Sequence, residues 1–225
     1  MRQSLRMLAR DWRAGELRVL AAALVVAVTS VTSVGFFADR VGRGLARDAH
    51  QLLGADLVLV SDHAFGAQLG APLEARKLRS ATAVAFMSMA IVEGRSQLAG
   101  VKAVTEGYPL RGQLRTAPAP GAADAPAAGG PARGKVWIEE RLVTALGASV
   151  GTRVQLGDAE LEVDAVLTLE PERSANFFNF APRLMMNAAD VPATGLIRPG
   201  SRASYYFYVA GAPEEVKSVE SALRA

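Results

Sequence analysis

The segment from Val19 to Ala38 holds twenty consecutive residues without a charged side chain. An α-helix rises about 1.5 Å per residue, so such a helix covers about 30 Å, the thickness of the hydrocarbon layer of a bilayer. A cleaved signal peptide has a shorter apolar region of about 7 to 15 residues. We therefore predict a retained transmembrane helix over 19–38, although Ser33-Val34-Gly35 also fits a small-x-small cleavage site. The residues assigned to the membrane include Val19, Leu20, Leu24, Val28, Val31, Val34, Phe36, Phe37 and Ala38.

The formal net charge of +3 lies entirely in residues 1–18, which hold five arginines against one aspartate and one glutamate. Positive residues before a first span favour a cytoplasmic N-terminus. We therefore predict the bacterial inner membrane, with the bulk of the chain in the periplasm. Leu5, Leu8 and Trp12 recur at helical spacing, which fits either an amphipathic interfacial helix or an ordinary charged flank. Because the rest of the chain is neutral, we expect no nucleic-acid partner.

The helical pattern continues beyond the apolar segment, over residues 39–54. Val41, Leu45 and Leu52 keep an apolar stripe, and the first strong helix breaker is Gly54. We predict one long helix that leaves the membrane as a stalk. It serves either as a rod that transmits force or as a simple spacer.

Residues 55–225 predict a mixed α+β domain in two subdomains. We expect strands at 56–61, 81–94, 96–105, 135–140, 152–157, 161–169 and 204–211, with helices starting near Pro72, Arg141 and Pro213. The stretch 116–134 is dense in alanine, proline and glycine, which predicts a flexible loop or linker. The last helix reaches Ala225 without a capping residue, so we expect the N-terminal part of a longer protein.

Patterns typical of catalysis are weak in this chain. Gly147-Ala148-Ser149-Val150-Gly151 matches the G-x-S-x-G pattern, but a nucleophile elbow needs a strand before the serine and a helix after it. Here the predicted order is reversed, and an enzyme that uses Ser149 remains only an alternative. There is no cysteine and no P-loop. We predict no catalytic, cofactor or metal residue, and if the protein uses the energy of ATP, a partner must supply it.

The remaining polar candidates have structural interpretations. His50 and His63 lie outside any metal-binding spacing, and the neighbours Ser61-Asp62-His63 are not arranged as triads usually are, so both histidines are interpreted as surface residues. The acidic pairs at 139–140 and 170–172 are interpreted as solvated strand edges.

Aromatic residues provide the candidate interaction surface. Four consecutive aromatics on one strand, 205–208, must point to both faces of a sheet. Packing in the core is the more common use of such residues, but one face is left to meet a partner or an apolar substrate. The residues singled out are Phe177, Phe178, Phe180, Tyr205, Tyr206 and Tyr208.

Four long phrases of the sequence resemble the MacB/FtsX-type ABC-transporter permeases, and in particular their YbbP-like branch. They are RDWRAGELRVL, VGFFADRVGRGLARDAHQLLGADLVLVSD, VKAVTEGYPLRG and FAPRLMMNAADVPATGLIRPGSR. The resemblance implies a first transmembrane helix and part of a MacB-like periplasmic core domain, with three further membrane helices beyond. It also implies no enzymatic activity in this subunit.

The resemblance further implies a cytoplasmic ABC ATPase partner, a second permease copy, membrane lipid and, by analogy, an exported esterase of the thioesterase kind. The function implied is coupling of ATP hydrolysis to periplasmic motion that exports or mobilises hydrophobic or lipid-like molecules. The alternative is a signal-transmitting scaffold that regulates a periplasmic hydrolase without transport. Fold analogy alone does not decide between them.

Overall fold

The computed structural model describes residues 16–66, 73, 76–172, 181–198 and 200–224. The chain divides into two compact units, Met1–Asp48 and Ala49–Ala225. The predicted interfacial helix at 1–18 lies almost wholly outside the described residues, as do the helix start near Pro72 and the aromatic residues Phe177, Phe178 and Phe180.

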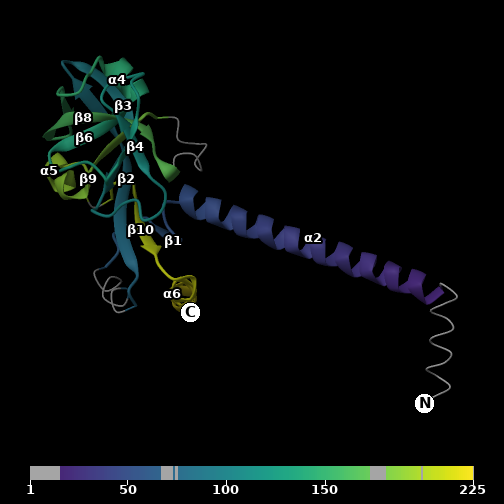
Figure 1. Cartoon of the computed structure of the whole chain (residues 1–225). Coiled ribbons are helices and arrows are strands. Elements are labelled where there is room, and N and C mark those ends of the chain that lie inside the picture. The colour runs from purple at the N-terminus through teal and green to yellow at the C-terminus, as the bar shows by residue number, and fades with distance from the viewer. Residues whose placement is uncertain (1–15, 67–72, 74–75, 173–180, 199, 225) are drawn as a thin grey trace. The chain divides into compact units, whose positions relative to one another are not determined.

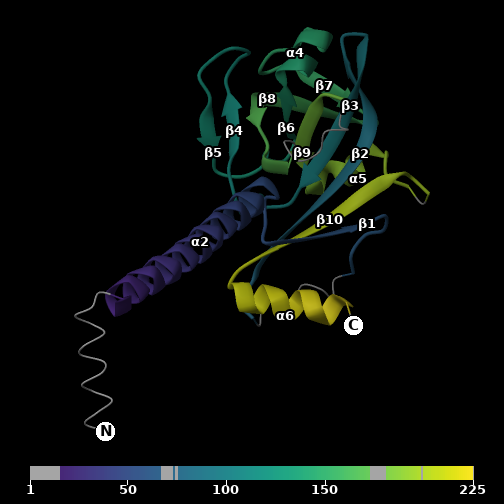
Figure 2. The ribbon, with the colours of Figure 1, turned by 90° about the vertical axis from the view of Figure 1, so that its right-hand side faces the viewer.

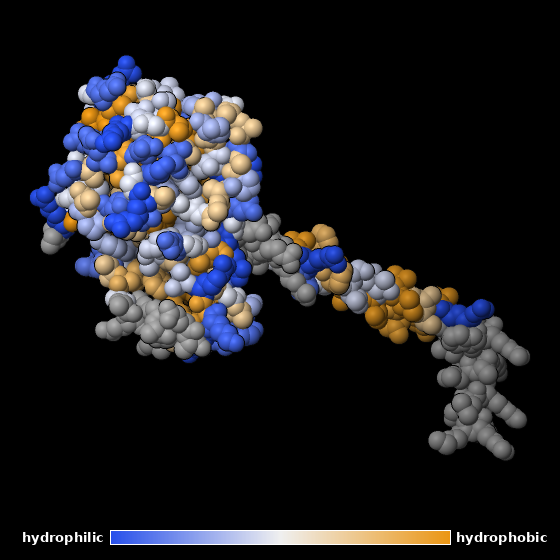
Figure 3. Space-filling view, turned by 60° about the vertical axis from the view of Figure 1, so that its left-hand side comes forward, coloured by the Kyte–Doolittle hydropathy of each residue, from blue (hydrophilic) through white to orange (hydrophobic). Residues whose placement is uncertain are grey.

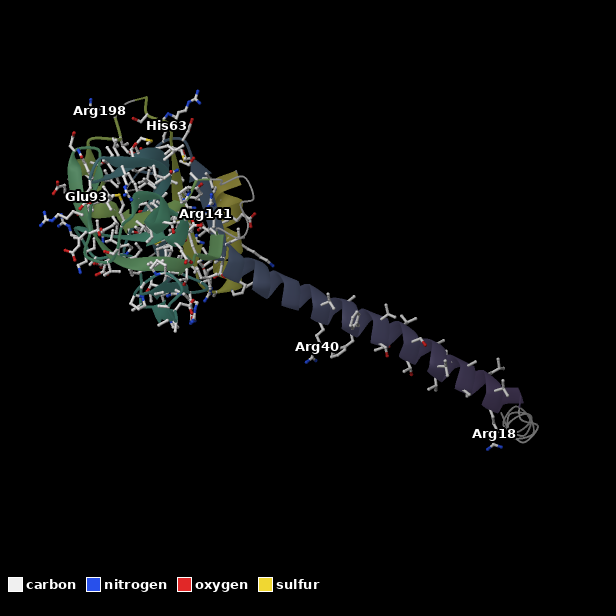
Figure 4. All side chains as sticks on the ribbon, turned by 90° about the horizontal axis from the view of Figure 1, so that it is seen from above. Arg18, Arg40, His63, Glu93, Arg141 and Arg198 are labelled. Atoms are coloured by element: carbon white, nitrogen blue, oxygen red, sulfur yellow. The ribbon has the colours of Figure 1, made fainter. Side chains whose placement is uncertain are left out.

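Helix α2 runs without interruption from Glu16 to Leu52 (Figure 1). Its apolar stretch, Arg18–Gly42, is long enough to cross a membrane and has none of its residues buried within the protein. Figure 3 shows this stretch of α2 as mainly hydrophobic, and Figure 4 shows Arg18 and Arg40 projecting near its two ends. The prediction of one long helix that continues beyond the apolar segment is confirmed.

The second unit is built on a mixed ten-stranded sheet. Its strand order is β1-β10-β2-β3-β9-β6-β8-β4-β5, with β7 paired to β2 and β8 off this path. The pairs β3–β9 and β6–β8 are parallel, whereas the other pairs are antiparallel. The strands are β1 Leu57–Ser61, β2 Arg79–Val92, β3 Arg95–Val104, β4 Leu114–Ala117, β5 Ala125–Ala127, β6 Lys135–Glu139, β7 Arg153–Leu156, β8 Ala159–Leu169, β9 Arg183–Asn187 and β10 Ala203–Ala210.

Short helices complete this unit: α4 Glu140–Leu146, the 3-10 turn η3 Ala188–Asp190, α5 Val191–Thr194 and α6 Pro213–Arg224. Together with the sheet they confirm the predicted α+β class. Residues Ala49–Ala225 form one compact unit, and their expected division into two subdomains stays a prediction.

The sheet buries apolar side chains on both of its faces because successive strand residues point to opposite sides. On β2, Val84 and Phe86 join one buried cluster, whereas Ala81 and Ala83 join a second one. The second cluster also contains Trp137, Met185 and Tyr208. A third cluster packs α6 against β1 and β10. Figure 2 shows α6 beside these two strands.

Most predicted strands are confirmed, including the β2–β3 hairpin. Its two turn residues, Glu93 and Gly94, both have positive φ, as the tight turn of a two-residue hairpin requires. Strand β9 is not among the predicted strands. Four of its five residues are buried, since it lies between β3 and β6, and a strand covered on both faces lacks the alternation that marks a strand in sequence.

The expectation of a loop or linker at 116–134 is corrected in one respect, because this segment contains part of β4 and all of β5. Proline is tolerated in an edge strand, which is where Pro126 lies. The carboxylate of Asp124 accepts hydrogen bonds from Arg115 and Thr168 and so ties the segment to β4 and β8. The alanine-rich composition of the segment gave no strand pattern, so the sequence did not predict the pairing of its strands.

Candidate functional site

The most unusual feature of the second unit is a charged side chain in the middle of the sheet. Lys102 on β3 is 2% exposed. Its ammonium group donates to Glu170 Oε1 at 3.0 Å, to Glu172 Oε2 at 2.6 Å and to the hydroxyl of Tyr108 at 2.8 Å. An ammonium has three protons to donate, so its hydrogen-bonding capacity is fully used.

Arg183 on β9 balances the second carboxylate charge of the cluster. Its Nε donates to Glu170 Oε2 at 2.7 Å, and both side chains are buried. The Glu172 carboxylate also accepts a hydrogen bond from the hydroxyl of Tyr208 at 3.0 Å. Two cations and two carboxylates therefore form a neutral buried charge cluster. Burial of charge is tolerated only with such pairing.

The pKa shifts in the cluster follow from this pairing. Burial alone lowers the pKa of Lys102, but the carboxylates of Glu170 and Glu172 outweigh it and raise that pKa above its ordinary 10.5. Burial alone raises the pKa of Glu170, but Lys102 and Arg183 bring it below its ordinary 4.5. Burial raises the pKa of Tyr108 and of Tyr208, so both keep their protons. Lys102 and Glu170 therefore stabilise each other in their charged forms.

Aromatic rings surround the Lys102 ammonium, which lies 4.5 Å from the ring centre of Tyr108, 5.6 Å from Tyr208 and 5.8 Å from Tyr206. Tyr206 and Tyr208 are stacked with their ring centres 6.1 Å apart. The negative face of an aromatic ring attracts a cation, so these rings add to the stabilisation by the carboxylates.

The cluster adjoins the point where α2 gives way to β1. Gly54 has a positive φ of 71°, and a side chain added there would come within 3.4 Å of Glu172 Oε1. That oxygen is buried and has no hydrogen-bond partner among the described residues. Glycine is therefore favoured at position 54 by its backbone conformation, and an added Cβ would only touch the cluster.

Arg111 holds the residues that follow α2. Its guanidinium binds both carboxylate oxygens of Asp56, at 2.7 to 3.2 Å, and its backbone N–H donates to the carbonyl of Gly54 at 2.9 Å. Asp56 also accepts from the backbone N–H of Gly211, which precedes α6. This clamp joins three segments, and bidentate arginine–carboxylate pairing fixes its geometry.

The expectation that the acidic residues at 170–172 are solvated strand edges is wrong. Glu170 is 2% exposed, and Glu172 is mostly buried. Lys102 lies on a strand 68 residues before Glu170, and Arg183 lies on a separate strand 13 residues after it, so local pattern could not reveal the pairing. The available signal was Lys102 itself, a single charge within the otherwise apolar run LAGVKAV.

The structure also changes which aromatic residues belong to the candidate interaction surface. Tyr208 is fully buried, so it is not part of an exposed surface. Its place in the apolar core next to β2 and β9 explains this. Tyr205 and Tyr206 are half-buried and line a small pocket together with Phe65, and their role in an interaction stays a prediction.

The residues considered for catalysis are scattered. Ser149 lies in a surface turn with its hydroxyl 3.2 Å from that of Thr152, after α4 and before β7, which is the reverse of a nucleophile elbow. His63 is exposed and pairs with its neighbour Asp62, whereas the side chain of His50 lies outside the described residues. Within the described ranges, no group of three or more acidic or histidine side chains is placed to hold a metal ion.

No family model matches the sequence. The chain is 33% identical over 211 residues, 94% of its length, to the uncharacterized ABC transporter permease YbbP of Escherichia coli (strain K12). It spans a quarter of the length of that relative.

The solved structures to which this chain is similar include two regions of bacterial proteins. The periplasmic region of MacB from Actinobacillus actinomycetemcomitans is 14% identical, with 78% of this chain and 86% of that chain covered and a TM-score of 0.46. The extracellular domain of the noncanonic ABC-type transporter YknZ from Gram-positive bacteria is 12% identical, with 62% and 68% covered and a TM-score of 0.44.

The helix and the sheet define a class of protein, an α+β domain that follows one long apolar helix. The sequence similarity gives the family. The chain belongs to the MacB/FtsX-type ABC-transporter permeases, in their YbbP-like branch.

Removing the Lys102 ammonium is expected to destabilise the second unit strongly. Lys102→Met leaves the buried carboxylates of Glu170 and Glu172 with one cation between them, which costs about 3–5 kcal/mol of unfolding free energy. Lys135→Met is the matched control, because Lys135 pairs with Asp164 on the half-exposed surface and such a pair contributes about 1 kcal/mol or less. Urea unfolding of the detergent-solubilised protein, followed by circular dichroism, measures both. Equal losses in the two variants would show that the cluster does not hold the fold.

Acid should weaken the same cluster. Because the folded-state pKa of Glu170 lies below its ordinary 4.5, the stability that this carboxylate contributes is present above pH 4.5 and is lost as the pH falls through the folded value. In the Glu170→Gln variant, the side chain at position 170 cannot take up a proton as the pH falls. We expect its unfolding free energy to fall less steeply between about pH 4.5 and pH 2.5 than that of the unaltered protein. Parallel pH profiles would contradict the assignment.

Proposed function

We propose that the chain is part of a permease subunit of an ABC transporter, in which a separate cytoplasmic ATPase hydrolyses ATP and the unit Ala49–Ala225 changes conformation in the periplasm. The cargo class is hydrophobic or lipid-like molecules. The observation that carries this proposal is the 33% identity to an ABC transporter permease over 94% of the chain.

The geometry of α2 supports the proposal. Its 37 residues correspond to about 55 Å of helix, of which a bilayer core takes about 30 Å. The helix therefore extends beyond the membrane as a continuous rod. The residues that follow α2 belong to the unit Ala49–Ala225, in which Arg111 binds the carboxylate of Asp56.

The arrangement in the membrane follows from charge. Five arginines precede Val19, so the N-terminus lies in the cytoplasm and the sheet in the periplasm of a bacterial inner membrane. The partners are a cytoplasmic ATPase, a second copy of the permease and membrane lipid. A periplasmic esterase or thioesterase is a further partner by analogy with the YbbP-like branch.

A second candidate function is a scaffold that passes an ATP-dependent signal to a periplasmic hydrolase without moving a substrate. A rigid helix joined to a folded domain serves this use equally well. Loss of lipid export without a division defect in a deletion strain favours transport, whereas the reverse favours the scaffold.

Membrane orientation can be tested by labelling, since residues 1–225 contain no cysteine. Two proteins with a single cysteine each are compared. In one, Met87→Cys places the thiol at an exposed site on β2. In the other, Val28→Cys places it within the apolar stretch of α2. We expect a membrane-impermeant maleimide, added to cells with a permeabilised outer membrane, to label position 87 and not position 28. Labelling of position 87 only after cell lysis would place the sheet in the cytoplasm.

Continuity of α2 is expected to be necessary for coupling. Gly42→Pro removes a helix hydrogen bond and clashes with the preceding turn, at a cost of about 3 kcal/mol. Gly42→Ala is the matched control, because an added methyl group meets nothing within 4 Å. In proteoliposomes with the ATPase subunit, we expect Gly42→Pro to lower the efflux of a fluorescent phospholipid per ATP hydrolysed by about tenfold or more, given that cost.

The same measurement separates the two candidate functions. ATP hydrolysis without phospholipid efflux in the unaltered protein would favour the scaffold. Unchanged efflux per ATP in Gly42→Pro would contradict a rod that transmits motion.

A further inference from the structure

One face of the sheet is covered by two separate groups of elements. On β10, Tyr205 packs against the first buried cluster, as does Ala188 of η3, whereas Phe207 belongs to the third cluster, which includes α6. Tyr205 is paired with Val84 of β2, and Phe207 is paired with Thr82, so these four side chains lie on the same face. The cover of this face therefore changes between two neighbouring positions of β10.

A cavity of about 220 Å³ lies at this place. The sheet lines it with Thr82, Val84 and Tyr205. Ala188 lines it from η3, and Phe65 lines it from the segment that follows β1. The cavity therefore separates the elements that cover the first cluster from those that cover the third.

Phe65 forms an aromatic wall of the cavity. Its ring packs edge-on against the ring of Phe207, with the ring centres 5.6 Å apart, so the wall is held in place. Phe65, Ala188 and Tyr205 are half-buried, and the lining residue Ala64 is exposed. A molecule can therefore reach the cavity from solvent while the sheet stays folded.

The lining has the chemistry of an apolar site. It consists of alanine, valine, threonine, phenylalanine and tyrosine, and none of these described lining residues carries a charge. A carboxylate or phosphate inside the cavity would lose its hydration without gaining a cation. The cavity therefore favours apolar groups, and a charged head group attached to such a group would stay in water.

The size of the cavity suits part of a hydrocarbon chain. An apolar protein cavity of about 150 Å³ is known to hold benzene, and the cavity here is larger. Protein interiors normally leave few voids larger than a water molecule. Apolar walls that face a void lack contact partners, and an apolar ligand would supply those contacts and remove apolar surface from water.

We propose that this cavity binds a single hydrocarbon chain of an amphipathic molecule, with the polar head group left in solvent. The acyl chain of a free fatty acid and that of a phospholipid share this chemistry. The inference rests on the proposed function only in taking the occupant to be the lipid-like cargo. Binding itself requires the cavity alone.

Photolabelling of the full-length protein in nanodiscs tests this proposal. Two probes carry a diazirine in an acyl chain: a fatty acid added in solution and a phospholipid placed in the bilayer of the nanodisc. After irradiation and digestion, mass spectrometry identifies the labelled residues. We expect label at Phe65, Ala188 or Tyr205 from at least one probe. Label from the fatty acid alone would show that the chain arrives as a free acid, and label from the phospholipid would show that it arrives as a lipid.

Variants that fill the cavity provide the comparison. Ala188→Leu places a larger apolar side chain in the lining, so we expect the label at the cavity to be lost while the label on α2 is unchanged. Ala189→Leu is the matched control, because Ala189 is the next residue of η3, is exposed and does not line the cavity. Ala64→Leu is a second filling variant, at an exposed position outside the helices and strands, so the test does not depend on the folding of Ala188→Leu.

Two results would overturn the proposal. One is the absence of label at the cavity from both probes, and the other is equal label in the unaltered protein and in both filling variants. The measurement needs neither ATP nor the ATPase subunit. Phospholipid efflux without label at the cavity would therefore contradict the binding site and leave the transport proposal standing, whereas label at the cavity without efflux would do the reverse.

Discussion

The ammonium group of Lys102 joins parts of the chain that are far apart in sequence. It lies on β3 and holds Glu170 and Glu172, which follow β8, while Arg183 on β9 binds the other oxygen of Glu170. Each of these charges is tolerated in the interior only because the others are present. The relative placement of β3, β8 and β9 therefore depends on this cluster, and the position of the segment from Gly54 to Asp56 beside it follows.

A buried charge cluster is weak evidence for stability in itself, since well-packed apolar residues often stabilise a core as much or more. The advantage of such a cluster is that its hydrogen bonds are directional. Apolar contacts are not directional, whereas an ammonium with three acceptors has one satisfied position. The clamp of Asp56 by Arg111 has the same directional character.

The two units differ in the kind of constraint that shapes them. In α2 the constraint is length and apolarity, because a helix within a bilayer must satisfy its backbone hydrogen bonds internally and expose apolar side chains. In the sheet the constraint is pairing between distant strands, including the parallel pairs β3–β9 and β6–β8. Among the described residues, the path of paired strands ends with β1 on one side and with β5 on the other.

The sequence by itself determined the long helix, the β2–β3 hairpin, the helix that ends at Gly147 and the family, because each is written in consecutive residues or local periodicity. Only the tertiary structure decided that Glu170 and Glu172 are buried, that Tyr208 lies in the core and that Arg183 begins a strand. The physical reason is that local pattern reports backbone preference and amphipathicity, whereas the pairing of buried charges and of central strands depends on residues outside the local segment, such as Lys102 and Glu172, which are 70 positions apart.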